Sequence, residues 1–151
     1  MKNPIGIFDS GIGGISILEK LKQLLPNENF IYLADNRNCP YGSKSKKEII
    51  SLSKKNCEKL IKLNCKIIII ACNTSTTNSI KKLREIIAIP IIGIEPGLKP
   101  AIHYTKTKNI GILATEKTLV SKLFFETLNQ NRIDDIHIHE QIGYELSLIH
   151  I

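Results

Sequence analysis

The segment KIIIIAC, residues 66–72, is the feature that most limits how this chain can fold. Four consecutive isoleucines leave no polar side for water, so a strand made of them has to be covered on both faces. Strands of this kind belong to parallel sheets that carry helices on each side. The segment therefore predicts a central strand, and the end of that strand delivers Cys72 to the place where small polar residues begin.

Short β-branched runs alternate with longer amphipathic stretches along the rest of the chain. This alternation of strand-like and helix-like segments predicts an α/β fold built from parallel-sheet βα repeats. A Gly and Pro interruption at 97–100 predicts a boundary between a first unit, 1–97, and a second unit, 98–151. Strands are expected at 5–9, 29–35, 66–72, 89–96, 109–114 and 136–140, and helices at 15–25, 43–63, 74–87, 98–107 and 116–130, with another helix starting in the last residues.

Composition excludes several classes of protein. The chain has 151 residues, enough for one ordinary domain, and its net charge of +7 comes from 18 Lys and 3 Arg spread along its length. Because no aromatic residues are interleaved with these charges, we do not expect a nucleic-acid partner. No apolar run reaches the length of a membrane span, and the N-terminus has no secretory pattern, so we expect a cytoplasmic protein.

The four cysteines suggest reduced thiols rather than a metal site or disulfides. None forms a C-x-x-C pair, and the histidines have no zinc-like spacing relative to them. We therefore expect no metal. The cysteines stand at positions 39, 57, 65 and 72.

Three polar clusters directly follow predicted strands. They are DSGIGG at 9–14, DNRNCPYG at 35–42 and CNTSTT at 72–77, and IEPG at 94–97 can add to them. Ligands of open α/β sheets bind beyond the carboxyl ends of the strands. We therefore expect the clusters to converge in space although 20 to 40 residues separate them in sequence.

The first two clusters each allow a simple structural interpretation. In DSGIGG the glycines lead to a helix N-terminus that favours an anion, but the spacing is not that of a dinucleotide site. The alternative is a tight turn in which Asp9 or Ser10 caps the helix. In PYG, Tyr41 offers a hydroxyl and Gly42 a backbone N–H, and an ordinary β-turn is the alternative.

The third cluster has the strongest chemical signal. Cys72 is expected at a helix start, where a thiol pKa can be lowered enough to provide a base or nucleophile at neutral pH. Asn73 and Thr74 can hydrogen-bond carboxylate or ammonium groups. The alternative is a small buried cysteine followed by helix-capping hydroxyls. No histidine is a persuasive partner, since nothing in the sequence places His103 near Cys72.

Taken together, the segments resemble the glutamate racemases of the aspartate/glutamate racemase superfamily. Each motif is weak alone, but all of them in register make a specific match that reaches about residue 128. The matching segments are GIFDSGIGGISIL, YLADNRNCPYGSKS, IIIIACNTSTTNSI, PIIGIEPGLKPA and IGILATEKTLVSKLFFETL.

The resemblance implies cofactor-independent interconversion of L- and D-glutamate, which provides D-glutamate for peptidoglycan and so for the cell wall and cell shape. Family members use two cysteines as acid and base on opposite faces of the substrate. Cys72 corresponds to the first of them, with Asp9 near it to assist proton transfer. The implied substrate-binding pairs are Asp9 and Ser10, Tyr41 and Gly42, and Asn73 and Thr74, with Thr115 and Thr118 near a substrate carboxylate.

The chain also departs from the family pattern. Family chains run well past 200 residues, and their second cysteine lies in a GCTH-like motif that is absent here. Cys39 is no substitute, because it falls in the same half as Cys72. We therefore expect the first domain of a two-domain racemase fold with the second domain incomplete, and a homodimer is left open. The alternatives are an aspartate racemase, a one-cysteine decarboxylase or a non-catalytic fragment.

Overall fold

The larger part of the structure is a four-stranded parallel sheet. A computed structural model describes residues 3–131, 135–144 and 146. The strands are β1 (Ile5–Asp9), β2 (Phe30–Ala34), β3 (Ile67–Ile70) and β4 (Ile91–Gly93), and their order in the sheet is β2-β1-β3-β4. All three strand pairs are parallel. The predicted parallel α/β fold is confirmed.

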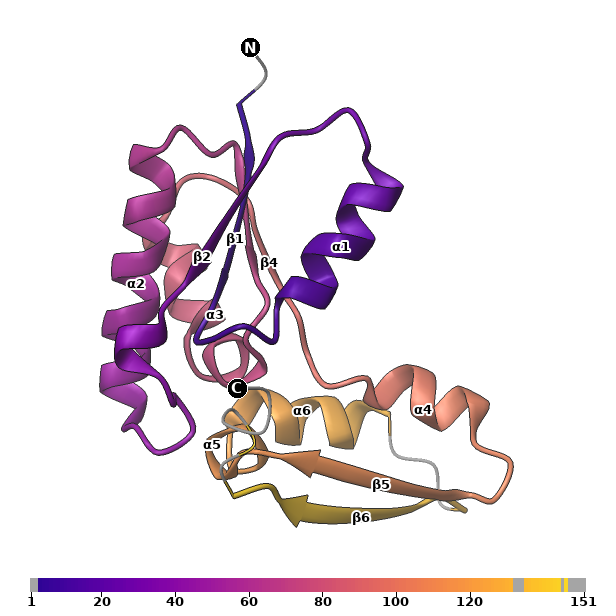
Figure 1. Cartoon of the computed structure of the whole chain (residues 1–151). Coiled ribbons are helices and arrows are strands. Elements are labelled where there is room, and N and C mark those ends of the chain that lie inside the picture. The colour runs from indigo at the N-terminus through magenta and orange to yellow at the C-terminus, as the bar shows by residue number, and fades with distance from the viewer. Residues whose placement is uncertain (1–2, 132–134, 145, 147–151) are drawn as a thin grey trace.

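Helices cover both faces of this sheet (Figure 1). Helix α1 (Ile15–Leu24) packs on one face, while α2 (Lys46–Lys62) and α3 (Asn73–Ile86) pack on the other. The side chains of β3 alternate between these layers: Ile68 and Ile70 join the cluster under α2 and α3, and Ile69 joins the cluster under α1. The unbroken isoleucine run is thus explained by helices on each side of one strand.

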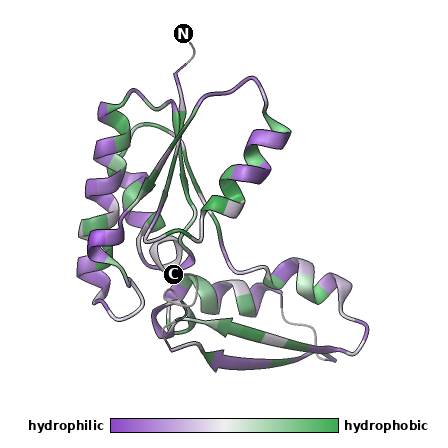
Figure 2. Ribbon diagram, viewed as in Figure 1, coloured by the Kyte–Doolittle hydropathy of each residue, from purple (hydrophilic) through white to green (hydrophobic). Residues whose placement is uncertain are grey.

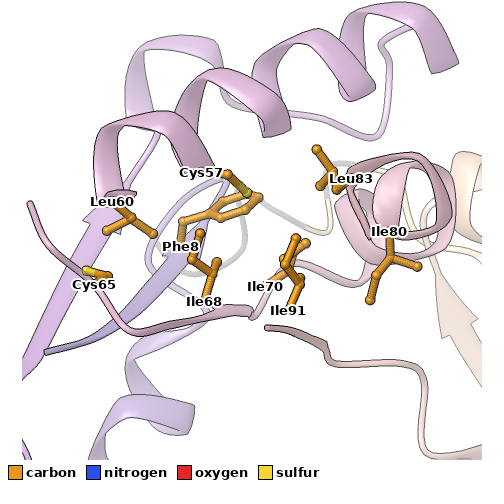
Figure 3. Packing of buried hydrophobic residues seen from close by; sticks show 9 residues of the cluster. All are labelled: Phe8, Cys57, Leu60, Cys65, Ile68, Ile70, Ile80, Leu83 and Ile91. Atoms are coloured by element: carbon orange, nitrogen blue, oxygen red, sulfur yellow. The ribbon is translucent and has the colours of Figure 1, made fainter. Parts of the chain in front are cut away.

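The main hydrophobic core lies between β1, β3 and the pair α2 and α3 (Figure 3). Apolar residues gather inside along the strands, and polar residues follow the outer sides of the helices (Figure 2). No helix within the described residues is long and apolar enough to cross a membrane. The core cluster consists of Phe8, Cys57, Leu60, Cys65, Ile68, Ile70, Ile80, Leu83 and Ile91.

The remaining elements form a smaller unit beside the carboxyl ends of the large sheet (Figure 1). Strands β5 (Asn109–Ala114) and β6 (His137–Ile142) pair in parallel, and Ala114 packs with Leu119 and Phe124. The helices of this unit are α4 (Leu98–Tyr104), α5 (Glu116–Leu119) and α6 (Lys122–Gln130). The division after residue 97 stays a prediction, although α4 begins at that point.

Local capping explains where several helices begin. Ser45 caps α2: its hydroxyl accepts from the Glu48 N–H in a reciprocal capping box, so the helix predicted over 43–63 begins at Lys46. The single helix predicted over 116–130 was wrong, because Ser121 breaks it: its hydroxyl accepts from the Phe124 N–H and starts α6. The helix start expected in the last residues lies outside the described residues.

Core packing around β3 leads to a stability prediction. Leu83 on α3 is fully buried, whereas Leu24 on α1 is 65% exposed. Leu83→Ala should lower the free energy of unfolding by about 2–5 kcal/mol, because it removes buried methyl groups and leaves a cavity. Leu24→Ala, the matched control, should change it by less than about 0.5 kcal/mol. Urea unfolding followed by circular dichroism measures both, and equal losses would contradict the assigned core.

Candidate active site

Two of the three predicted polar clusters, DSGIGG at 9–14 and CNTSTT at 72–77, line a cavity of about 250 Å³. It lies where β1 and β3 end and where the second unit meets the first. The apolar part of the cavity wall includes Pro96, Leu113, Ala114 and Leu146. The predicted site residues that line it are Asp9, Ser10, Cys72, Asn73, Thr74, Thr115 and Thr118. The expected convergence is therefore confirmed for the clusters at 9–14 and 72–77, whereas no residue of the cluster at 35–42 lines the cavity. The roles of the lining residues stay predictions.

Cys72 lies two residues after the end of β3 and is the N-cap of α3. Its sulfur accepts a hydrogen bond from the backbone N–H of Ser75, with a distance of 3.4 Å. The Ser10 hydroxyl, from the turn after β1, lies 3.4 Å from the same sulfur. The side chain packs beside Tyr41 and Ile49 and is 7% exposed. The thiol is thus fixed on several sides while its neighbours open onto the cavity.

The protonation of this thiol differs from the expectation based on its helix start. Burial raises the pKa of Cys72, and the negative charge of Asp9 raises it further. Hydrogen bonds from Ser10 and from the backbone of Ser75 lower the pKa, but they do not offset burial. The lowered pKa suggested by the sequence is therefore wrong for this state, and Cys72 is a protonated thiol at neutral pH.

Asp9 closes the turn that follows β1. Its Oδ2 accepts from the backbone N–H of Gly11 at 3.0 Å and from that of Gly14 at 3.4 Å. A Cβ at Gly14 would lie 2.7 Å from the Cβ of Ala71, so only glycine lets the start of α1 pass this close to the end of β3. The tight turn of DSGIGG is confirmed, but no side-chain hydrogen bond caps α1 at Gly14. Asp9 also lines the cavity, and anion binding at this helix start stays a prediction.

The loop that carries Tyr41 and Gly42 stands behind the cavity wall. A short 3-10 helix (Asn36–Asn38) and a cis Cys39–Pro40 bond lead into it. Tyr41 is 1% exposed, and a Cβ built on Gly42 would lie 2.9 Å from the Cγ2 of Thr115. Neither residue is among those that line the cavity. Their contact with a substrate therefore stays a prediction.

Three threonine hydroxyls meet at the boundary between the two units. The Oγ1 of Thr74 lies 2.8 Å from that of Thr115 and 3.3 Å from that of Thr118, and the last two are 3.0 Å apart. Asn78 on α3 adds a hydrogen bond to the carbonyl of Lys117 in α5. One wall of the cavity thus comes from the second unit, beyond the predicted boundary at residue 97.

Other candidates from the sequence lie elsewhere. His103 is exposed on α4 and does not line the cavity. Cys57 is a core residue, and burial raises its pKa to about 12. Among the described residues, no group of three or more His, Cys, Asp or Glu side chains is arranged to hold a metal ion.

Sequence reasoning missed the residues that hold the cavity wall from behind. Asp35 and Asn56 are buried next to Tyr41 and share hydrogen bonds with it. Asn56 lies within a helix rich in lysines, where an amide is usually exposed to solvent. The period of α2 does place Asn56 on the same face as the buried Ser53 and Leu60, and this was the one available signal.

Comparison with known proteins identifies the family. The family model described as Asp/Glu/Hydantoin racemase matches residues 5–142. The chain belongs to the Asp/Glu/hydantoin racemase family. A glutamate racemase of Ralstonia pickettii is 46% identical over 143 residues, which cover 95% of this chain and 50% of that protein. This family member therefore spans about half the length of the curated relatives it matches.

Solved structures of relatives share the fold. Escherichia coli glutamate racemase, in complex with L-glutamate and the activator UDP-MurNAc-ala, matches with a TM-score of 0.88 at 30% identity. That match covers 98% of this chain and 56% of the E. coli chain. Francisella tularensis glutamate racemase in complex with D-glutamate matches with a TM-score of 0.80 at 33% identity, covering 97% of this chain and 55% of that one.

Ser10 lowers the pKa of Cys72 and Asp9 raises it, so substitutions at these two positions should shift the pKa of Cys72 in opposite directions. Ser10→Ala removes a hydrogen bond that lowers the thiol pKa, so alkylation of Cys72 should need a higher pH. Asp9→Asn removes a negative charge, so alkylation should begin at a lower pH. The rate of iodoacetamide alkylation against pH, read at the Cys72 peptide by mass spectrometry, measures both. Shifts in the same direction would contradict this account of the thiol.

Proposed function

We propose that this chain is the first part of a glutamate racemase and that its cavity binds glutamate without a cofactor. Cys72 would exchange the α-proton on one face of the substrate. The observation that carries the proposal is a buried thiol beside Ser10 and Asp9 in a cavity of a chain 46% identical to a glutamate racemase. The chemistry of these groups supports it in three steps.

The first step concerns the thiol and its charge. An α-proton of an amino acid is a weak acid, so its removal needs a base held against it and an acid on the opposite face. Burial and the charge of Asp9 keep Cys72 protonated, so it has to lose its proton before it acts as the base. A substrate ammonium group close to the sulfur would favour the thiolate, because an opposite charge lowers a thiol pKa. Asp9 is the neighbouring carboxylate that can accept the proton.

The second step concerns the grip on the substrate. Asn73 and Thr74 begin α3, where unpaired N–H groups and the helix dipole favour a carboxylate. The hydroxyls of Thr115 and Thr118 lie next to Thr74 and can turn toward the same carboxylate. Ser10 faces the sulfur from the other side. In this proposal Tyr41 and Gly42 complete the binding set from the neighbouring loop.

The third step concerns the opposite face of the substrate. Among the described residues that line the cavity, Cys72 supplies the thiol and the facing wall includes the apolar Pro96, Leu113 and Leu146. In this proposal a second cysteine serves that face, and the resemblance places it in the other half of full-length racemases. Residues 1–97 would form the first domain and residues 98–151 the beginning of the second.

The biological role follows from the same proposal. A glutamate racemase would provide D-glutamate for peptidoglycan and thereby support the cell wall and cell shape. We place this activity in the cytoplasm, where glutamate is the small-molecule partner. A homodimer is compatible with the proposal.

Glutamate binding tests the proposed grip. Thr74→Val keeps the size of the side chain and removes its hydroxyl, so it should weaken glutamate binding about tenfold, the cost of one hydrogen bond to a charged group. Thr105→Val, the matched control, removes a hydroxyl that bonds Asn109 outside the cavity and should leave binding unchanged. Isothermal titration calorimetry measures both. A folded chain without saturable glutamate binding would contradict the proposal.

Racemisation tests the division of the chemistry between two thiols. We expect the 151-residue chain alone not to convert L-glutamate into D-glutamate, because one face of the substrate meets no thiol. In a full-length form, Cys72→Ser should abolish racemisation, whereas Cys65→Ser, in the core, should preserve it. Chiral chromatography of the product measures the turnover. Wild-type activity in the full-length Cys72→Ser variant would remove Cys72 from the mechanism.

A further inference from the structure

A buried polar network lies on the side of Tyr41 that faces away from the cavity. The Tyr41 hydroxyl donates to Asp35 Oδ2 at 2.7 Å, and the Asn56 amide donates to the same oxygen at 3.0 Å. That amide also lies 3.0 Å from the Tyr41 hydroxyl, and Asn38 donates to Asp35 Oδ1 at 2.8 Å. Asp35 is 6% exposed, and Tyr41 and Asn56 are each 1% exposed.

The carboxylate at the centre of this network is charged although it is buried. Burial alone would raise the pKa of Asp35, but hydrogen bonds from Tyr41, Asn56 and Asn38 outweigh burial and hold the pKa below its usual value. Hydrogen bonds to a charged acceptor are stronger than neutral ones. Asp35 therefore fixes the phenol of Tyr41 firmly, and Asn56 ties both groups to α2.

The other end of Tyr41 reaches the thiol. Its side chain packs in one cluster with Cys72 and Ile49, and the next residue, Gly42, stands against Thr115 at the cavity wall. One loop therefore connects the Asp35 network with both the sulfur and the threonine wall. Several groups face the thiol from the elements around it. They are Asp9 at the end of β1, Ser10 directly after β1, Tyr32 on β2, the backbone of Ser75 on α3, and Tyr41.

We propose that Asp35 and Asn56 are positioning residues that hold the Tyr41 ring against the Cys72 sulfur and so limit the access of water to the thiol. Neither residue touches the cavity, and both act through Tyr41. The arrangement keeps Cys72 protonated until a charged substrate enters. Its importance for proton transfer rests on the proposed function, whereas its effect on the thiol does not.

The direction of the effect follows from burial. If the network loses Asn56, the phenol loses one of its two anchors and the ring can move away from the sulfur. Water then reaches the sulfur and stabilises the thiolate, so the pKa of Cys72 falls toward its ordinary value. Asp9 stays in place, and its negative charge still keeps the pKa of Cys72 partly raised. Asn56→Ala suits the test because it changes no charge.

The experiment measures alkylation of Cys72 by iodoacetamide as a function of pH in the 151-residue chain without glutamate. Peptide mass spectrometry reads Cys72 and the core residue Cys57 separately in the same sample. Asn56→Ala and Tyr41→Phe test the two ends of the network. Ser79→Ala is the matched control, because it removes a buried hydroxyl of α3 that bonds Ser75 and has no contact with the network.

The expected result is a shift of the Cys72 profile to lower pH in Asn56→Ala and Tyr41→Phe. Alkylation near neutral pH should become roughly three- to tenfold faster, in proportion to the thiolate present. Cys57 should stay unreactive, and Ser79→Ala should keep the original profile. An unchanged Cys72 profile in folded Asn56→Ala overturns the proposal. So does a joint gain at Cys72 and Cys57, since it indicates general loosening of the fold.

This test is separate from the test of the function. If the chain binds no glutamate but Asn56→Ala shows the expected shift of the Cys72 profile, the positioning network stands and the proposed racemase is refuted. If the chain binds glutamate but the Cys72 profile is unchanged in Asn56→Ala, the proposed racemase stands and the positioning network is refuted.

Discussion

Burial of β3 on both faces is the constraint on which the rest of this structure depends. Four isoleucines have to be kept from water, and this demands α1 on one side and α2 with α3 on the other. The strand ends at Ile70 and leads through Ala71 to Cys72, the N-cap of α3. The thiol therefore directly follows a strand of the core, and its position follows from the packing of the core.

The environment of the thiol shows how burial competes with the start of a helix. The Ser75 N–H and the Ser10 hydroxyl both contact the sulfur, and both favour the thiolate. The dry surroundings and the charge of Asp9 act against them and prevail. An opposite charge close to the sulfur would act in the other direction and lower the pKa of the thiol.

The cavity belongs to two units of the chain, and this is why no single motif describes it. Thr74 from the first unit meets Thr115 and Thr118 from the second, and Asn78 bonds the backbone of Lys117 nearby. Leu113 and Leu146 add apolar lining. Relatives about twice as long share this fold over the matched half.

Sequence alone determined the alternation of strands and helices, the parallel sheet and the convergence of the polar clusters at 9–14 and 72–77, because buried strands and strand ends leave local patterns. It also pointed to Cys72 and to Thr115 and Thr118, through motifs in register. Only the tertiary structure decided the break of the helix at Ser121, the direction of the Cys72 pKa and the burial of Tyr41 against Asp35 and Asn56. The pKa and the burial of Tyr41 depend on which groups from distant segments exclude water together, and the break depends on a local cap competing with a helical period.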